Sequence, residues 1–144
     1  MIGDPISGVR NMSKFLVAIL LLFFAGSAFA DTCGGKLIGY SRIYSNGLTI
    51  GQLQLYYNAA NGNNCAVLKH ASPTWGVSLR TKVDLFTCTD STCARPANPR
   101  DIDTGYYRYE AGPVRIYGKG RCVAAVGTMD YRGVQAGTGI RSCD

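Results

Sequence analysis

The segment VSLRTKVDLFT, residues 77–87, alternates in side-chain character along most of its length. One set of alternate positions is aliphatic or β-branched: Val77, Leu79, Thr81, Val83 and Leu85. The other set is polar: Ser78, Arg80, Lys82 and Asp84. A period of two predicts a β-strand with one buried face and one wet face. Beyond residue 30 no stretch keeps the three- and four-residue spacing of an amphipathic helix, so the chain is predicted to be all-β.

Two further segments have the pattern of β-hairpins. In the first, residues 53–57 lead through a turn rich in Asn and Gly into a return strand at 65–68. In the second, residues 114–117 turn through Gly118-Lys119-Gly120 and return at 121–126. Asn and Gly favour such turns because they tolerate positive φ. Each return strand carries a cysteine at or near its start, which favours two hairpins of similar design.

The rest of the chain is predicted with weaker signals. Residues 105–109 are expected to pair with the strand at 114–117 as a third hairpin, since Pro113 sits at a strand start that needs no donor. Residues 89–104 are predicted to be a loop, and residues 127–139 irregular chain. Together these patterns predict a small, disulfide-stapled antiparallel sandwich or a partly open barrel built from hairpins.

The first 30 residues have the pattern of a secretory signal peptide. Lys14 precedes an uncharged apolar run, and Ala28-Phe29-Ala30 has the small-x-small pattern that precedes the cleavage site. The run of about 12 residues is shorter than the ~20 that a membrane-spanning helix needs. We therefore expect cleavage after Ala30, a single secreted β domain at 31–144, and no transmembrane segment in the mature chain. Residues 1–11 do not resemble an n-region, so Met12 is hypothesised as the true start.

All six cysteines lie in the mature chain, and an even number in an exported protein predicts three disulfides. A zinc site is less favoured because the chain has one close cysteine pair and one histidine. Six cysteines allow 15 connectivities, and the sequence does not choose among them. We favour a sequential scheme because it ties both termini to hairpin strands and prevents their fraying. The expected pairs are Cys33 with Cys65, Cys88 with Cys93, and Cys122 with Cys143.

The mature chain is mildly basic. Residues 31–144 hold 13 Lys and Arg against 8 Asp and Glu, a net charge of +5. The basic residues stand singly and do not form the runs of a nucleic-acid or heparin site, so no nucleic-acid partner is expected. A solvated basic surface and an attraction to anionic envelope polymers are both consistent with this distribution.

The sequence offers few residues that could form a catalytic site, and we predict no catalytic residue, metal site or cofactor. A nucleophile–histidine arrangement would need His70, which lies at a strand end and is interpreted as structural or solvent-exposed. Paired carboxylates of glycosidase type are formally available, but they are interpreted as solvated loop residues. They are Asp84, Asp90, Asp101, Asp103, Glu110 and Asp130.

Tyrosines dominate the aromatic residues, with nine in the mature chain beside Phe86 and Trp75. Such side chains suit half-exposed recognition surfaces because one end is apolar and the other polar. Alternation puts the candidate residues on the polar sides of their strands, which predicts a ligand-binding sheet face. They are Tyr56, Tyr106, Tyr117, Arg108 and Arg115. The alternative is that the tyrosines only cover sheet surface and edges.

Four short motifs carry a family resemblance. They are GQLQLYYN at 51–58, NGNNCAV at 61–67, AGPV at 111–114 and GRCV at 120–123. In this order they resemble the spore-associated protein A family of secreted actinobacterial proteins. The resemblance implies a small secreted β domain found at cell surfaces and carries over no catalytic activity. The chain departs from the family at Ala124-Ala125, where a Trp-containing segment is expected, and in the ring closed by Cys88 and Cys93.

The leading hypothesis is a non-enzymatic domain, secreted to the periplasm, the cell surface or the medium. It is envelope-associated or binds a ligand through the Tyr/Arg face, with an anionic envelope polymer, a glycan or an extracellular protein as partner. The alternative is an inhibitor or antagonist of an extracellular enzyme that presents the Cys88 to Cys93 loop, since a rigid exposed loop lowers the ordering cost of binding. An enzyme ranks third.

Overall fold

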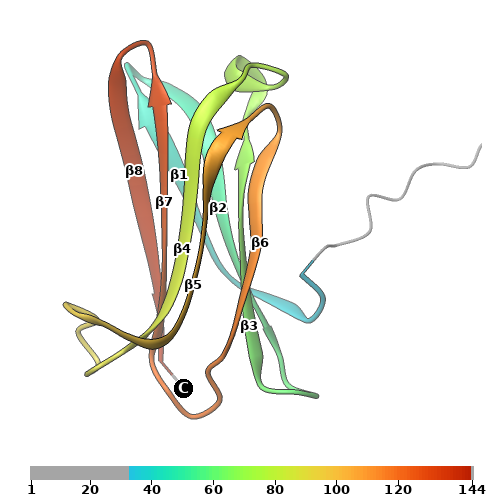
Figure 1. Cartoon of the computed structure of the whole chain (residues 1–144), viewed down its shortest axis with the longest axis vertical. Coiled ribbons are helices and arrows are strands. Elements are labelled where there is room, and N and C mark those ends of the chain that lie inside the picture. Colours follow the sequence, from blue (N-terminus) through green and yellow to red (C-terminus); the bar gives the residue numbers. More distant parts are fainter. Residues whose placement is uncertain (1–32, 144) are drawn as a thin grey trace, which may run out of the picture.

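The computed structural model describes residues 33–143, so the predicted signal peptide, its cleavage site and the choice between Met1 and Met12 lie outside the described residues. Within this range eight strands form two antiparallel four-stranded sheets, packed face to face (Figure 1). The predicted all-β fold is confirmed, and it is a sandwich because the two sheets keep separate ladders. The strands are β1 (Lys36–Ser45), β2 (Leu48–Asn58), β3 (Asn63–His70), β4 (Leu79–Cys88), β5 (Pro96–Tyr107), β6 (Glu110–Tyr117), β7 (Val123–Tyr131) and β8 (Val134–Ser142).

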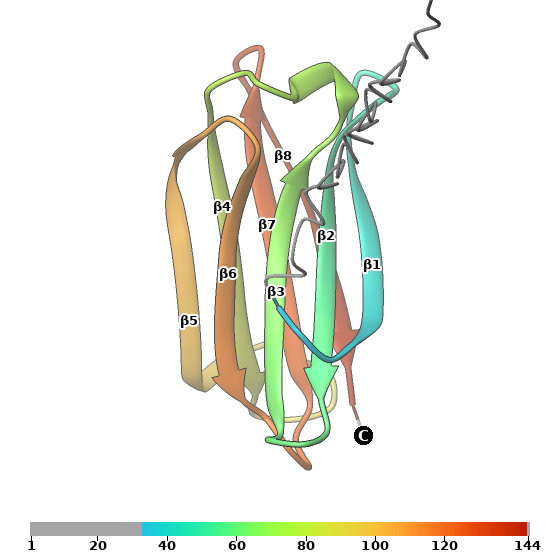
Figure 2. The ribbon, with the colours of Figure 1, turned by 90° about the vertical axis from the view of Figure 1, so that its right-hand side faces the viewer.

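The first sheet has the order β1-β2-β3-β6 and the second the order β5-β4-β7-β8 (Figure 2). The chain builds β1 to β3 as a meander and then crosses to β4 and β5. It returns with β6 to the first sheet and finishes with the β7-β8 hairpin in the second. A three-residue 3-10 helix, η1 (Ser72–Thr74), lies in the crossing from β3 to β4. In the described range no helix is long and apolar enough to cross a bilayer.

The predicted hairpin at 53–68 is confirmed as β2 and β3, and the alternating segment at 77–87 forms β4 from Leu79 onward. The predicted hairpin of 114–117 with 121–126 is wrong. These segments are β6 and β7, which pair with β3 and β4 in different sheets. A short glycine-containing connection serves a crossing between sheets as well as a turn within one, so local sequence does not distinguish them.

The third predicted hairpin is also wrong, because residues 105–107 belong to β5 and pair with β4, while β6 pairs with β3. The predicted loop at 89–104 ends early, since β5 begins at Pro96. The predicted irregular chain at 127–139 is mostly strand, because β7 and β8 form a hairpin there. Glycines in β7 and β8 weaken the strand signal in the sequence, but pairing along the whole β7-β8 ladder supplies their hydrogen bonds.

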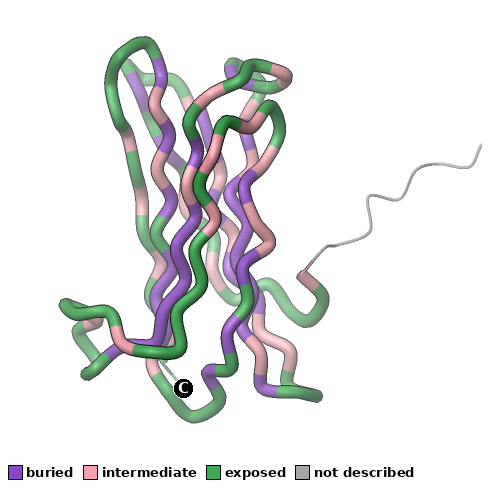
Figure 3. The backbone as a smooth tube through the Cα atoms, viewed as in Figure 1, coloured by how far each residue is buried: buried purple, intermediate pink, exposed green. Residues whose placement is uncertain are grey.

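The core lies between the two sheets, where the four central strands and the edge strands β1 and β6 supply buried side chains, whereas β5 and β8 supply only partly buried ones (Figure 3). Val83 and Leu85 of β4 have no exposed surface, as the alternation predicts. They pack among aliphatic residues of both sheets, chiefly Ile43, Ile50, Leu53, Leu55, Leu68, Val114, Val123 and Met129. The central strands β2, β3, β4 and β7 supply most of these buried residues.

The three predicted disulfides are confirmed: Cys33–Cys65, Cys88–Cys93 and Cys122–Cys143. The first ties the start of the described chain to β3, and the third ties its end to the start of β7. In residues 33–143 no cysteine is free. Disulfides of this density are typical of exported domains, which is compatible with the predicted secretion.

Both open sides of the sandwich are bridged by side chains. On one side Asp103 and Asp101 of β5 accept hydrogen bonds from the backbone N–H groups of Gly112 (2.7 Å) and Arg115 (2.9 Å) in β6. On the other, the hydroxyls of Ser41 in β1 and Thr138 in β8 share a hydrogen bond of 2.5 Å. The two aspartates are therefore strand residues that join the sheets, and their interpretation as loop carboxylates is wrong.

Candidate functional site

The five residues predicted to form one binding face lie in three places. Tyr56, Arg115 and Tyr117 share the outer face of the first sheet, since Tyr56 pairs with Cys65 and Cys65 with Arg115. Tyr106 lies on the second sheet and is 76% exposed, and Arg108 lies in the turn from β5 to β6. Tyr56 itself is only 9% exposed, and its hydroxyl donates to Gln54 at 3.1 Å. They do not form a single surface.

An open groove of about 740 Å³ lies instead at one end of the first sheet, between β1, β2 and the segment that follows β3. Its lining combines a cation, an indole ring, an amide and hydroxyl groups. The lining residues are Arg42, Thr49, Gln52, His70, Ala71, Ser72, Pro73 and Trp75. A concave site of this size with a few convergent polar groups is the usual form of a small-ligand site.

Arg42 stands on one side of the groove, between two tyrosines of the same strand. Tyr40, Arg42 and Tyr44 alternate along β1 and are all exposed, so they project from the same face. The Arg42 Nε donates to the Tyr40 hydroxyl at 3.2 Å, and its guanidinium carbon lies 5.7 Å from the centre of the Tyr40 ring. Hydrogen bonds with the hydroxyls of Tyr40 and Tyr44 raise the pKa of Arg42 further above its usual range. The guanidinium is thus charged and held in place.

The opposite wall is the segment 71–76, which is tied to β2 by its own polar groups. The Ala71 N–H and the Thr74 hydroxyl both donate to the Ile50 carbonyl, at 3.0 and 2.6 Å. Pro73 stands at the start of η1, where its missing N–H costs nothing. These bonds hold the wall at a fixed distance from the Arg42 side of the groove.

Trp75 ends this wall and is 55% exposed. Its ring packs on Tyr109 with 4.9 Å between ring centroids and a tilt of 57°. The neighbouring Gly76 N–H donates to the Arg108 carbonyl at 2.9 Å, and the Arg108 Nη1 donates back to the Gly76 carbonyl at 3.0 Å. Arg108, a predicted binding residue, therefore also positions the loop that carries Trp75.

His70 forms part of the floor and is 4% exposed. Its Nδ1 lies 3.0 Å from the Thr74 carbonyl oxygen, which only accepts, so Nδ1 carries a proton. Its Nε2 lies 2.9 Å from the Thr81 hydroxyl. Burial lowers the pKa of His70, and the hydrogen bond to Thr74 opposes this shift only in part. Both nitrogens are used to join β3, the 71–76 segment and β4, which supports the structural interpretation of this histidine.

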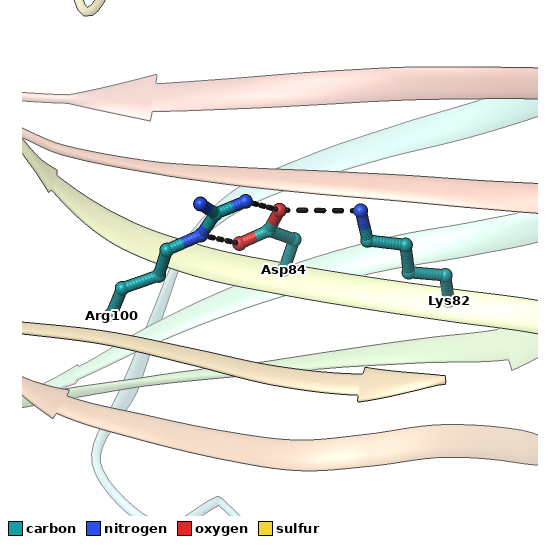
Figure 4. A network of polar contacts seen from close by, with 3 residues as sticks. All are labelled: Lys82, Asp84 and Arg100. Carbon is teal, nitrogen blue, oxygen red and sulfur yellow. Dashed lines mark hydrogen bonds and ion pairs between the residues drawn. The ribbon is translucent and has the colours of Figure 1, made fainter. Parts of the chain in front are cut away.

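Among the described residues the most enclosed carboxylate is that of Asp84 in β4, on the outer face of the second sheet, because its neighbours Val83 and Leu85 point into the core; Figure 4 shows its partners. Arg100 donates a bidentate pair of hydrogen bonds to the Asp84 carboxylate, from Nε to Oδ1 at 2.9 Å and from Nη2 to Oδ2 at 2.6 Å. The Lys82 ammonium lies 3.5 Å from Oδ2 of the same carboxylate. Burial alone would raise the pKa of Asp84, but the two cations outweigh it and hold the pKa below its usual value. This network is therefore a structural ion pair that covers β4.

The described residues hold no group of three or more His, Cys, Asp or Glu side chains that would suit a metal ion.

Asp103 also accepts a hydrogen bond of 2.5 Å from the Tyr107 hydroxyl, and this bond raises the pKa of Tyr107. Both of its carboxylate oxygens are thus engaged within the β5-β6 contact. Asp101 and Asp103 therefore belong to the joint between the sheets.

Arg42, Gln52 and Trp75 are groove residues that are absent from the predicted binding set. The pattern Tyr40-x-Arg42-x-Tyr44 was available in the sequence, because alternation alone puts its three residues on one face. The approach of Trp75 was not available, since it depends on where the crossing from β3 to β4 lies over β2. No family model, no curated protein and no solved structure matches this chain, so the spore-associated protein A resemblance stays a prediction.

Proposed function

We propose that the chain is a secreted, non-enzymatic domain that binds an acidic glycan of a cell envelope in the groove beside Arg42. The observation that carries this proposal is the position of the Arg42 guanidinium, fixed between two tyrosines on one side, with exposed Trp75 on the other. An arginine fork matches a carboxylate or phosphate group, and an indole face suits the apolar face of a sugar ring.

The remaining lining residues fit the same ligand. Thr49, Gln52 and Ser72 offer hydroxyl and amide groups that both donate and accept, as sugar hydroxyls require. The wall at 71–76 is held by backbone and side-chain bonds before any ligand arrives, so less ordering accompanies binding. The open form of the groove leaves room for a polymer to continue beyond the bound units.

Binding without hydrolysis is favoured by the lining itself. No Asp or Glu is among the groove residues, whereas glycoside hydrolysis by the common mechanism needs two carboxyl groups beside the bond that breaks. The mild positive charge of the mature chain favours association with anionic polymers outside the cell. The resemblance to secreted proteins of cell surfaces points to the same location.

The inhibitor hypothesis receives less support. The Cys88–Cys93 loop is closed on itself, because the Cys93 N–H donates to the Asp90 carbonyl at 3.2 Å and Asp90 Oδ1 accepts from the Thr92 N–H at 2.8 Å. Such a rigid, exposed turn meets the requirement of the inhibitor hypothesis, but it presents few side chains for specific recognition, whereas the groove combines a cation, an indole ring and hydrogen-bonding groups. No contact in residues 33–143 favours it over the groove as the recognition element.

The test is calorimetric titration of the mature protein with an acidic polysaccharide and with its neutral counterpart. We expect binding of the acidic polymer only, and a loss of about tenfold or more in affinity for Arg42→Gln and for Trp75→Ala, the size expected of a charged hydrogen bond or a stacked ring. Weaker binding at high salt is expected for Arg42 contacts.

The control variant is Tyr117→Ala. Tyr117 is about as exposed as Trp75, but it belongs to the predicted Tyr/Arg face at the far end of the first sheet. Folding of each variant is checked by thermal unfolding. If Tyr117→Ala abolishes binding while Arg42→Gln leaves it intact, the predicted face and not the groove is the site. If neither polysaccharide binds the native protein, the glycan proposal is wrong.

A further inference from the structure

Exposed hydrophobic side chains gather at the end of the sandwich that holds η1. Four chain connections meet there: the β1-β2 turn, the segment 71–78, the β5-β6 turn and the β7-β8 turn (Figures 1 and 2). Of the 13 large hydrophobic residues that are exposed in the described chain, more than half lie in these connections or in the strand ends beside them. They are Tyr44, Leu48, Trp75, Val77, Tyr106, Tyr109 and Val134, each 44% or more exposed.

This surface, which we call the η1 end, also has an excess of positive charge. Arg80, Arg108 and Arg132 are exposed there, whereas the two acidic residues nearby are only half-exposed. Those are Glu110, which opens β6, and Asp130, which accepts a hydrogen bond from Gln135 at 3.2 Å. The η1 end therefore exposes hydrophobic side chains next to arginine side chains.

We propose that the η1 end rests on an anionic lipid bilayer, with its apolar tips in the headgroup region. Trp and Tyr are the residues enriched at membrane–water interfaces, because their rings are apolar and their polar atoms stay hydrated. Leu48, Val77 and Val134 supply aliphatic surface to bury. Arg80, Arg108 and Arg132 match the negative surface potential of an anionic leaflet.

The arrangement of the tips favours a bilayer over a protein partner. The apolar side chains come from four separate connections, and each contributes one or two of them between glycine, asparagine or arginine residues. Apart from the Trp75–Tyr109 ring pair, the apolar side chains come from different connections. A protein interface needs a contiguous hydrophobic core, whereas single apolar side chains enter a lipid headgroup layer one by one. The loop carrying Trp75 is fixed to the β5-β6 turn by the Gly76 and Arg108 hydrogen bonds, so its aromatic tip stays at the end of the molecule.

This inference does not depend on glycan binding, and the test uses lipid alone. Trp75 is the chain's single tryptophan, so its fluorescence reports directly on the η1 end. The mature protein is mixed with vesicles of phosphatidylcholine or of phosphatidylcholine with phosphatidylglycerol. We expect a blue shift and quenching by brominated acyl chains only with the anionic mixture, with weaker binding as salt increases.

The decisive variant is Leu48→Ser with Val134→Ser, which leaves every groove residue and Trp75 in place. We expect it to lower the vesicle partition coefficient by roughly tenfold, from the loss of two partly buried aliphatic groups. The matched control is Leu37→Ser with Tyr117→Ser, which removes two exposed apolar residues from strand ends away from the η1 end and leaves partitioning unchanged.

Three results would overturn the proposal. The first is an absence of brominated-lipid quenching with anionic vesicles. The second is an equal loss of partitioning in the control pair. The third is a dimer in sedimentation velocity that Leu48→Ser with Val134→Ser dissolves, because a second copy and not a bilayer would then cover this end. Vesicle binding that persists in Arg42→Gln would support the proposal, because this variant weakens only the glycan contact and leaves the apolar side chains of the η1 end in place.

Discussion

Removing the guanidinium of Arg100 is a direct test of the electrostatics of the second sheet. Asp84 is 6% exposed in its side chain, and Arg100 supplies both of its short hydrogen bonds. In Arg100→Met the stem still covers the Phe86 ring, whose centre lies 5.9 Å from the guanidinium carbon. The Asp84 carboxylate would keep only Lys82, at 3.5 Å. The substitution therefore isolates the charge from the packing (Figure 4).

The magnitude follows from the burial of the two partners. Breaking a fully buried pair costs about 3–5 kcal/mol, but the Arg100 side chain is 37% exposed and Lys82 remains, so we expect a loss of about 2 kcal/mol at neutral pH. For a domain of this size that corresponds to roughly 8 °C in Tm. Asp84→Asn with Arg100→Met should recover part of the loss, because no buried charge is then left without its main partner.

The pH dependence gives the reasoning a second readout. The pKa of Asp84 is lowered in the folded protein, so its stabilisation is present above the ordinary value of 3.8 and is lost as pH falls through the folded value. In Arg100→Met burial dominates and the pKa rises, so the deficit against the native protein shrinks in acid. Urea unfolding at several pH values measures it, with Arg141→Met, exposed on the same sheet, as control. A deficit below 0.5 kcal/mol, or one that is equal at neutral and acidic pH, would refute the reasoning (about 0.5 kcal/mol being typical of a surface change).

Three other predictions concern stability. Because burial lowers the pKa of His70, the unfolded chain binds its proton at higher pH; stability is complete above the ordinary value of 6.5 and falls below it, and urea unfolding of His70→Gln should lack this slope. Replacing the Cys33–Cys65 pair by serine should cost roughly 3–4 kcal/mol, but replacing the Cys88–Cys93 pair only about 2, since its loop is far shorter; thermal unfolding that shows equal losses would contradict this. Gly112→Ala should lower stability by about 2 kcal/mol, because Gly112 has φ 94° and a Cβ there would lie 2.8 Å from the Ala66 carbonyl oxygen; an unchanged Tm would contradict it.

The strands β2, β3, β4 and β6 were readable from the sequence, but β1, β8 and most of β5 were not, and of the pairings only β2 with β3 was predicted correctly. The alternation from Leu79 to Leu85 gives the inner face of β4, and the turn between Tyr57 and Cys65 gives the β2-β3 hairpin. The segment from Val114 to Val126 contains two strands, as its pattern indicates, yet they separate into different sheets. A strand pairs with the strand that the whole fold places beside it, which can be distant in sequence. Here β6 pairs with β3, and β7 pairs with β4.

The candidate site divides in the same way. Alternation in β1 places Arg42 between two tyrosines, because neighbours two apart on a strand share a face. The other side of the groove is the β3-β4 connection, residues 71–78, which reads in the sequence as ordinary connecting chain. Its position is set by hydrogen bonds from Thr74 to Ile50 and from Gly76 to Arg108.

The sequence by itself indicated the all-β class and, from the even number of cysteines, three disulfides, because these depend on local periodicity and composition. The secretory pattern at 1–30 stays a prediction, and the structure selected one cysteine pairing among the possible ones. Only the tertiary structure decided which residues from different strands and loops share one surface. It separated Tyr106 from Tyr56 and Tyr117 by placing β5 in the other sheet, and it brought Trp75 across from Arg42. The physical reason is that alternate residues of one strand share a face because of strand geometry. Which strands and loops lie beside that face is decided by the packing of the whole core.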